Sequence, residues 1–345
     1  MIDVGWEQKV YPATKLAIVA DALKAEGVSL RDALKGTHTF ATELHSPLTR
    51  VSVNQVIQAY CNAMALSNDP HFAYRTGLKS HVSLYGMYGF AILSSMNFHQ
   101  TMQFAVRYHQ LATPLVKLRF DVGTDRAIWE IDPLPHPAID ARLYKFIVDM
   151  QIGVSVSLHR DVMGSAFIPL EIHVTFNAPK DQEKYSEAFG CPVIFDQTKN
   201  RFVFDAAWLS GTPQFGNEIT YASVLSLCDD MHEELALRVG VAGKVREYLL
   251  ATIGRHTSFE DVANRLDMPV RTLRRKLREQ HTSFRELVDE LRAHVAMKYL
   301  RDTEMTIEDI AVAIGFSDTA NFRHAFRRWT KTSPQDFRRV FGAHG

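Results

Sequence analysis

The densest cluster of chemically active side chains lies between Arg271 and Arg278, where five of eight residues are basic and none is acidic. At about 100° per residue, Arg271, Arg275 and Arg278 fall on one face of a helix, with Arg274 on its shoulder. Arginine binds guanine O6 and N7 through paired hydrogen bonds, and further cations hold phosphates. The cluster therefore predicts a helix that binds DNA. A basic face that only meets solvent is the alternative.

A second segment, from Thr319 to Lys331, has the same division into two faces. Phe322, Phe326 and Trp329 recur at helical spacing and should face inward. Asparagine can read adenine through N6 and N7, and arginine or lysine can hold a phosphate. The polar residues on or beside the outer face are Thr319, Asn321, Arg323, His324, Arg327 and Lys331. We expect a second helix that binds DNA here.

Each of these helices follows another amphipathic helix, and the two pairs repeat one pattern. The segments 257–260 and 306–309 both offer a hydroxyl side chain as the N-cap, followed by acidic residues. Apolar residues then recur at i, i+3, i+4 and i+7. The matching pairs, 48 residues apart, are Phe259 and Ile307, Val262 and Ile310, Ala263 and Ala311, and Leu266 and Ile314. The order helix, tight turn, helix therefore occurs twice. It predicts a duplicated helix-turn-helix unit in which the second helix of each copy enters the major groove.

A long helix is expected between the two units, because apolar residues recur from Phe284 to Val295 and the pattern ends near Leu300. Such a helix fixes the distance between the recognition helices. We therefore expect them to enter successive major grooves, about 34 Å apart. Because a rigid connecting helix cannot adjust, this geometry predicts either bent DNA or a strained interface. A last helix, 335–340, has Pro334 at its first turn.

The charge of the chain is divided unevenly along its 345 residues. Of the 39 basic and 39 acidic residues, 17 and 13 lie between Arg255 and Gly345, so this end carries +4 and the remainder −4. The asymmetry favours an anionic partner for the C-terminal end alone. No apolar run is long enough to span a membrane, and the first ten residues lack the order of a signal peptide. We expect a cytoplasmic protein without a membrane partner.

The sequence gives little support to metal, redox or enzyme chemistry. Cys61, Cys191 and Cys228 lie far apart, and the 15 histidines form no pair at ligand spacing, so we predict no metal and no cofactor. Nucleophile-elbow, zinc-protease, P-loop and dinucleotide fingerprints are absent. An enzyme with an appended DNA-binding module, such as a repair methyltransferase, would need an activated cysteine. We therefore predict that the chain is not an enzyme.

The first 213 residues mix helical and strand patterns. The predicted elements are helices at 14–25, 53–66 and 101–112, a hairpin of 116–120 with 127–131, and short strands at 170–176, 193–195 and 201–204. The apolar segment 86–96 is expected in the core. Linker composition follows at 210–217, and then a helix, 221–239, that either dimerises or only connects.

The fold class that follows is an α+β N-terminal domain and an all-α C-terminal domain with two helix-turn-helix units joined by a long helix. The predicted boundaries are 1–213 for an effector-sensing and dimerisation domain, 214–239 for a linker with a helix, and 240–345 for the double helix-turn-helix domain.

The C-terminal region resembles AraC/XylS-type regulators. The signature covers about Gly240 to Val340, and its matching residues are Ile310-Ala311, Gly315-Phe316, Phe322, Phe326-Arg327 and Ser333-Pro334 through Phe337-Arg338. Two positions where the family often has glycine depart from it, Asp267 and Thr332. Neither departure removes a DNA contact, but both should alter the local turns.

The resemblance also implies roles for individual residues. Base contacts are implied for Arg271, Arg274, Arg275, Thr319, Asn321 and His324, and phosphate contacts for Arg323 and Arg327. Arg278 and Lys331, which face outward on geometry, are assigned to phosphate as well. The family further implies double-stranded promoter DNA as the partner, with direct or inverted repeats, together with a homodimer and contact with RNA polymerase.

The N-terminal region is similar to the arabinose-binding-like sensor domain of a subgroup of these regulators. The matching stretches run from Arg75 through Ser94 and from Val174 through Phe195. The subgroup resembles ornithine-responsive activators and virulence regulators that sense fatty acids. The resemblance therefore implies a small-molecule effector, either a metabolite such as an amino acid or a fatty acid.

An effector pocket should be mostly apolar with a few convergent polar groups. The candidate residues are Arg75, His81, Tyr85, Tyr88, His99, Arg107 and Trp129, although each one alone is also explained as a surface or core residue. Arg107, Tyr108 and His109 suggest a carboxylate clamp, but neighbouring residues of a helix should not all face one pocket.

We therefore predict a sequence-specific, DNA-binding transcription regulator, an activator controlled by a small molecule. The alternative is a ligand-independent regulator whose N-terminal domain only dimerises, because a sensor fold can lose its ligand without losing its shape. Stabilisation by a ligand would separate the two.

Overall fold

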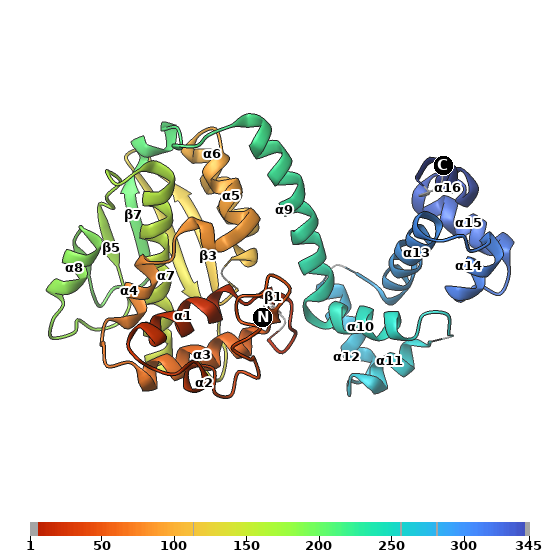
Figure 1. Cartoon of the computed structure of the whole chain (residues 1–345), viewed down its shortest axis with the longest axis horizontal. Helices are drawn as coiled ribbons and strands as arrows, with labels where there is room; N and C mark the ends of the chain where they lie inside the picture. Colours follow the sequence, from red (N-terminus) through yellow and green to blue (C-terminus); the bar gives the residue numbers. More distant parts are fainter. Residues whose placement is uncertain (1–5, 113, 256, 281, 342–345) are drawn as a thin grey trace. The chain divides into compact units, whose positions relative to one another are not determined.

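The chain forms two compact units, Met1–Leu235 and Ala236–Gly345, in a computed structural model that describes residues 6–112, 114–255, 257–280 and 282–341 (Figure 1). The first unit combines helices with a five-stranded sheet, and the described part of the second unit is helical. The α+β and all-α classes predicted from the sequence are therefore confirmed. None of the described helices is both long and apolar enough to cross a membrane.

The elements of the first unit agree closely with several predicted ones. Its helices are α1 Thr14–Ala25, α2 Leu30–Ala33, α3 Val53–Leu66, α4 Phe72–Leu78, α5 Gly86–Ser94, α6 Phe98–Tyr108, α7 Ala141–Met163, α8 Glu183–Phe189 and α9 Glu218–Arg238, with short 3-10 turns η1 Val82–Tyr85, η2 His109–Leu111 and η3 Ala206–Ser210. Its strands are β1 Tyr11–Pro12, β2 Arg50–Val51, β3 Val116–Val122, β4 Arg126–Pro133, β5 Glu171–His173, β6 Val193–Ile194 and β7 Arg201–Asp205. The expected linker helix, α9, lies mostly in this compact unit. The functional boundaries at 213 and 239 stay predictions.

The five-stranded sheet has the strand order β3-β4-β7-β5-β6. Its pairs are antiparallel, except that β5 and β6 run parallel. Side chains alternate between the two faces, so Trp129, Phe202 and Phe204 are buried together on one of them. The long helix α7 packs there, and the ring of its His159 lies 4.8 Å from Phe202 and 5.4 Å from Phe204.

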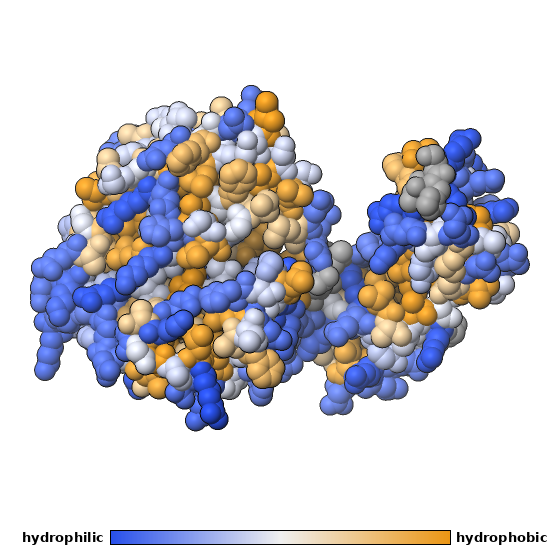
Figure 2. Space-filling model, viewed as in Figure 1, coloured by the Kyte–Doolittle hydropathy of each residue, from blue (hydrophilic) through white to orange (hydrophobic). Residues whose placement is uncertain are grey.

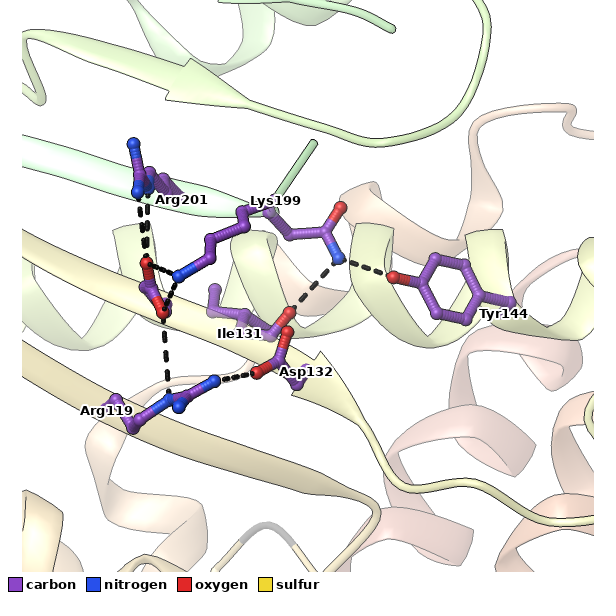
Figure 3. A network of polar contacts seen from close by, with 8 residues as sticks. Arg119, Ile131, Asp132, Tyr144, Lys199 and Arg201 are labelled. Atoms are coloured by element: carbon purple, nitrogen blue, oxygen red, sulfur yellow. Dashed lines mark hydrogen bonds and ion pairs between the residues drawn. The ribbon is translucent and has the colours of Figure 1, made fainter. Parts of the chain in front are cut away.

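A polar network around Glu130 occupies the other face of the sheet (Figure 3). Lys199 Nζ donates to both carboxylate oxygens of Glu130 at 2.8 and 2.9 Å, and Arg201 Nη2 donates to Oε1 at 3.1 Å. These bonds hold the pKa of Glu130 below its ordinary value, although burial acts in the opposite direction. The buried Asn200 donates to the hydroxyl of Tyr144 in α7 at 2.8 Å. Glu130 therefore links β4 to β7 on this face of the sheet, while the Asn200 bond ties the start of β7 to α7 on the opposite face.

Two glycines set the crossing of α4 and α7. A Cβ on Gly77 would lie 2.4 Å from the backbone oxygen of Met150, and a Cβ on Gly153 would lie 2.4 Å from that of Tyr74. Backbone atoms of a packed helix cannot move aside to admit a methyl group. The two helices therefore touch backbone to backbone, which brings α4 and its neighbours close to the centre of the unit.

The prediction that the segment 86–96 lies in the core is only half right. Tyr88 and Ile92 of α5 are buried, but Met87 and Phe90 are 40% and 49% exposed. A helix at the edge of a domain can bury only one face, whatever the other face contains. Figure 2 shows apolar side chains gathered on the surface over this part of the first unit.

Helix α9 is held to the first unit through its Asp229. Arg107 Nη2 donates to Asp229 Oδ1 at 2.7 Å, and the hydroxyl of Tyr108 donates to the same oxygen at 2.5 Å. These neighbours were expected to point apart. They converge because the Arg107 guanidinium folds over the Tyr108 ring, 5.0 Å from its centre. The clamp suggested by the sequence thus holds a carboxylate of this chain.

We expect Asp229→Ala to lower the free energy of unfolding of the full-length protein by about 1–3 kcal/mol, because the buried Tyr108 hydroxyl would lose its acceptor. Asp229→Asn keeps an acceptor oxygen and should lose less. Urea unfolding followed by circular dichroism measures both. If both variants unfold like the wild type, Asp229 does not hold α9.

Candidate nucleic-acid interface

The second unit consists of two small helical cores that share one helix. Its helices are α10 Gly240–Ala251, α11 Phe259–Arg265, α12 Val270–Glu279, α13 Phe284–Asp302, α14 Ile307–Ala313, α15 Thr319–Thr330 and α16 Pro334–Phe341. Leu287 of α13 is buried with α10, α11 and α12, and Leu300 is buried with α14 and α15. The long helix predicted between the two helix-turn-helix units is therefore part of both cores.

The first helix of each pair begins with a capping box. Ser258 Oγ accepts the backbone N–H of Asp261 at 3.1 Å, and the Asp261 carboxylate accepts the backbone N–H of Ser258 at 2.9 Å. Thr306 and Asp309 repeat the arrangement at 3.0 and 3.3 Å. These bonds satisfy N–H groups that lack partners in the first turn. The N-caps predicted for the two helices are therefore confirmed.

The turns of the second unit require left-handed backbone at particular residues. Asp267 has φ of 50° and Gly315 has φ of 83°. A short polar side chain tolerates this conformation better than most, which explains why aspartate can replace the glycine expected at 267. The left-handed residue at the end of α15 is Lys331, with φ of 63°, and not the neighbouring Thr332.

We expect Lys331→Gly to raise the free energy of unfolding by up to about 1 kcal/mol, because glycine ends a helix in this conformation without strain. The same change should weaken DNA binding if Lys331 holds a phosphate. Urea unfolding and a DNA titration measure the two effects. A less stable variant would mean that the bond from Lys331 Nζ to the carbonyl of Arg328, at 3.3 Å, outweighs the strain.

Helix α12 presents its arginines to solvent and its leucines to the core. Leu273 and Leu277 are buried. The residues with exposed side chains are Arg271, Arg274, Arg275 and Arg278. All four arginines predicted from the helical period therefore lie on the accessible side of this helix. Their contacts with DNA stay predictions.

Two of these arginines are already oriented by neighbours. The guanidinium of Arg274 stands 5.5 Å from the centre of the Phe259 ring in α11. Arg275 Nη1 lies 2.5 Å from Glu279 Oε1, one helical turn further on. Because Arg275 and Glu279 are both exposed, their pairing is worth little in water and can be exchanged for a base or a phosphate.

Helix α15 offers a more polar and less basic face. Phe322 and Phe326 are fully buried. The predicted contact residues with exposed side chains are Asn321, Arg323, His324, Arg327 and Lys331, and Thr319 is half-buried. Asp318 caps the helix by accepting the backbone N–H of Asn321 at 2.7 Å. It also accepts the Asn321 side-chain amide, which has to exchange this bond to read a base.

Two contacts that the sequence analysis missed join the helix-turn-helix units. Arg292 of α13 donates through Nη2 to the backbone oxygen of Gly315 at 3.2 Å, and its guanidinium stands 4.9 Å from the Phe316 ring. Gly254, in the loop after α10, lies so close to the second helix-turn-helix unit that a Cβ on it would be 2.7 Å from the backbone oxygen of Ala313. A lone arginine and a lone glycine carry no spacing signal, so sequence patterns could not reveal this junction.

The seven candidate effector residues do not line one pocket. Tyr85 and Tyr88 lie together, with ring centroids 6.3 Å apart. Arg75 instead lines a surface groove of about 660 Å³ between α1 and α4, where it pairs with Asp69 at 3.2 Å. The groove and the two tyrosines are therefore separate places in the first unit.

The remaining four candidates are dispersed. His81 Nδ1 lies 3.0 Å from Asp161, and Arg107 is bound to Asp229 as described above. His99 is exposed on α6. Trp129 is buried against the sheet, and its Nε1 has no hydrogen-bond partner among the described residues. The structure does not bring any of these four together with the tyrosine pair.

Comparison with known protein families assigns most of the chain. Residues 27–212 match the family described as the arabinose-binding domain of AraC transcription regulator, N-terminal. Residues 262–340 match a helix-turn-helix domain. The first match covers more than half of the chain, and the second covers the segment that holds α12 and α15.

Relatives that match most of the chain are regulators by name. The ornithine utilization regulator of Pseudomonas aeruginosa is 26% identical over 336 residues, 97% of this chain and 98% of that protein. The regulator VqsM of the same organism is 28% identical over 273 residues, 77% and 82% of the two chains. Among solved structures, the transcriptional regulator CdpR of P. aeruginosa has a similar fold, with a TM-score of 0.50 and 21% identity over 93% of this chain and 96% of that one. The resemblance drawn from sequence motifs is confirmed.

Proposed function

This chain belongs to the AraC-type transcription regulators with an arabinose-binding N-terminal domain, and we propose that it is a sequence-specific activator controlled by a small molecule. It is a DNA-binding regulator of transcription. The first unit would hold the effector, the second would read the promoter, and the activator would contact RNA polymerase in the cytoplasm. The absence of catalytic motifs supports a regulator and not an enzyme.

The observation that carries the proposal is the pair of helices α12 and α15. Each helix presents a row of exposed hydrogen-bond donors and packs its apolar face into a separate buried core. Helix α13 joins the two cores. Helices of this kind can enter the major groove, where arginine and asparagine distinguish bases. The implied base contacts are Arg271, Arg274, Arg275, Thr319, Asn321 and His324, and the implied phosphate contacts are Arg278, Arg323, Arg327 and Lys331.

Capture of fragmented genomic DNA by the purified full-length protein, sequenced at two salt concentrations, tests this proposal. We expect one recurrent site that survives the higher salt, with half-sites about one helical turn apart. Such a site would also identify neighbouring genes, and a reporter fused to their promoter would tell activation from repression. Random fragments that disappear at the higher salt would contradict sequence-specific binding.

We expect Arg327→Ala to weaken binding to all DNA sequences alike and to flatten the salt dependence by about one phosphate contact. Arg327 is exposed near the end of α15, where we expect its side chain to reach DNA phosphates and not the base edges. Titrations of specific and random DNA at several salt concentrations measure the slope. A selective loss for one sequence would instead place Arg327 on a base.

Control by a ligand has to be tested against the ligand-independent alternative, because most candidate pocket residues are already paired within the chain. His81 is bound to Asp161 and Arg107 to Asp229, which favours the alternative of a ligand-independent regulator. An effector must raise the unfolding temperature by mass action. The name of the ornithine utilization regulator makes amino acids the first compounds to screen, followed by fatty acids. No stabilisation by any compound would support the alternative.

We also propose that the regulator is a homodimer. Exposed apolar side chains on the first unit support this assignment, in particular Met87 and Phe90 of α5 and Ile219 and Leu227 of α9. Exposed apolar patches of this kind commonly mark a protein interface. The molar mass in solution, measured by light scattering at several concentrations, tests the assignment. A monomer at all concentrations would contradict it.

A further inference from the structure

Strand β3, Val116–Val122, forms one edge of the five-stranded sheet (Figure 1). On the neighbouring strand β4, Ile131 donates its backbone N–H to the carbonyl of Asn200, on the β7 side, at 3.0 Å. The direction of bonding alternates along an antiparallel strand, so the odd-numbered residues of β3 bond to β4 and the even-numbered residues point their backbone groups outward. Among the described residues, no hydrogen bond reaches these outward groups, which belong to Leu118, Phe120 and Val122.

The outer side of β3 is therefore a row of unused donors and acceptors. Such an edge is a template on which another strand can form the same ladder. The opposite edge strand of the sheet, β6, spans only Val193–Ile194, whereas β3 has seven residues. Two residues offer too few hydrogen bonds to hold a strand. Of the two edges, β3 is thus the one that can bind another chain.

Charged side chains alternate with apolar ones along β3 and share the sheet face of the Glu130 network. Arg119 Nη2 donates to Asp132 at 2.8 Å (Figure 3). Lys117 and Asp121 are exposed, and among the described residues neither has an ion-pair or hydrogen-bond partner. Charges of one sign on an edge strand repel a second strand. Here both signs occur on one strand, so an antiparallel copy of β3 can place each sign opposite the other.

We propose that β3 pairs antiparallel with β3 of a second copy of this chain, so that the two first units share one continuous sheet. The two-fold axis passes through a pair of Phe120 residues, whose outward N–H and C=O groups bond to each other. In this register Arg119 lies opposite Asp121 of the second copy, and Leu118 lies opposite Val122. The inference rests on the proposed homodimer, and it names the interface.

The apolar face of β3 favours the same register. Phe120 is half-buried, with its ring 4.6 Å from that of Trp129, and Val122 is 52% exposed. Pairing would cover Val122 with Leu118 of the second copy and bring the two Phe120 rings together. A register centred on Arg119 would use the same outward groups, but it would set two guanidinium groups directly opposite each other, which is unfavourable. Charge and packing therefore select the pairing centred on Phe120.

An apolar helical surface adjoins this strand edge. Helix α6 contacts both β3 and α5, and it exposes Val106 at 38%. Helix α5 exposes Met87 and Phe90 at 40% and 49%. A stable interface buries about 800 Å² on each partner, which is more than one short strand edge provides. We expect the exposed side chains of α5 and α6 to contribute the remaining area.

Asp121→Arg tests the charge pairing in the full-length protein. The new guanidinium would face Arg119 of the second copy at both symmetric positions, so we expect the dimer dissociation constant to rise by about tenfold or more. Glu187→Arg is the matched control, because Glu187 is exposed on α8, which precedes the opposite edge strand β6. Light scattering over a concentration series measures both, and circular dichroism checks the fold. Equal dissociation constants for the two variants would overturn the proposal.

Phe120→Cys tests the register. Residues of a hydrogen-bonded antiparallel pair have Cα atoms about 5.5 Å apart, which a disulfide can span. We expect mild oxidation to give a covalent dimer on a non-reducing gel. Leu118→Cys is the matched control, because its two copies would lie about 14 Å apart. The wild type, with Cys61 half-buried and Cys191 and Cys228 buried, should give no such dimer. Cross-linking through position 118 but not through position 120 would overturn the register.

These measurements separate this inference from the proposed homodimer. A wild type that is monomeric at every concentration would overturn both, and it would leave the β3 edge to a strand of another protein. A dimer that persists in Asp121→Arg and does not cross-link through Phe120→Cys would leave the homodimer standing and overturn this interface. If Asp121→Arg is a folded monomer that binds paired half-sites more weakly than the wild type, both are supported, because two linked units bind DNA more tightly than one.

Discussion

Replacement of Arg275 by alanine is expected to weaken binding to the preferred DNA site by about 5–150-fold and to relax the preference at one base pair. The residue is exposed on α12, opposite the buried Leu273 and Leu277, so its side chain can extend into a groove. Its exposed partner Glu279 offers little competition for the guanidinium. The loss should therefore fall on DNA binding and not on folding.

A titration of labelled DNA, with the preferred site and its single-base variants, measures both effects of Arg275→Ala. Arg275→Lys keeps the charge but not the paired hydrogen bonds, so it should relax base preference while retaining more of the affinity for random DNA. Arg301→Ala is the matched control, since Arg301 is exposed at the end of α13 and pairs with Asp302. Unchanged affinity and preference in Arg275→Ala would remove α12 from the base-reading surface.

The architecture of the second unit could be predicted because its signals are local. The hydroxyl and acid of each capping box lie three residues apart, as Ser258 and Asp261 or as Thr306 and Asp309, and they fix where a helix begins. The apolar period then determines which face is buried, as with Phe322 and Phe326. Neither step requires knowledge of a distant residue, so both could be read from the chain alone.

Helix α7 escaped prediction because it is buried on more than one side. Consecutive residues such as Ile147, Val148, Asp149 and Met150 are all buried, so the apolar period that marks a surface helix is blurred. Its crossing with α4 depends on Gly77 and Gly153, which are far apart in the sequence. A contact between two backbones leaves no pattern in either segment.

The surroundings of the candidate effector residues were the least predictable, because their partners are distant in the chain. Arg107 looked available for a ligand, yet its partner Asp229 follows 122 residues later. The burial of Lys15, beside Leu16 on the buried face of α1, was not predicted either. A lysine within the apolar stripe of a helix is a signal that sequence reading can use. The residues that lie opposite such a lysine can be identified only from the fold.

The spacing between the two recognition helices, α12 and α15, depends on more than the shared helix α13. Arg292 binds the turn of the second helix-turn-helix unit through the carbonyl of Gly315 and the ring of Phe316. Gly254 brings the loop after α10 into contact with the end of α14. A helix alone could bend or twist, whereas these contacts join the cores at a second point. The half-site spacing that the protein accepts should therefore be narrow, and the DNA should bend to meet it.

Gly254→Val is accordingly expected to lower the free energy of unfolding by about 2–5 kcal/mol and to weaken the preference for one half-site spacing. Its φ of 86° suits glycine alone, and its Cβ would clash with a backbone oxygen that cannot easily yield. Gly27→Val is the matched control, because Gly27 has φ of 87° but open space around a Cβ. It should show the conformational strain without the clash, and no change in DNA binding.

Urea unfolding and titrations with DNA whose half-sites are moved by one base pair measure the two effects of Gly254→Val. If the variant loses stability no more than Gly27→Val does, the contact with Ala313 is not a close one in solution. If it loses stability but rejects altered spacings as strongly as the wild type, α13 and Arg292 fix the recognition helices without help from Gly254. If Gly254→Val loses both stability and the preference for one half-site spacing, the contact between Gly254 and Ala313 holds the two helix-turn-helix units at the spacing that the DNA must match.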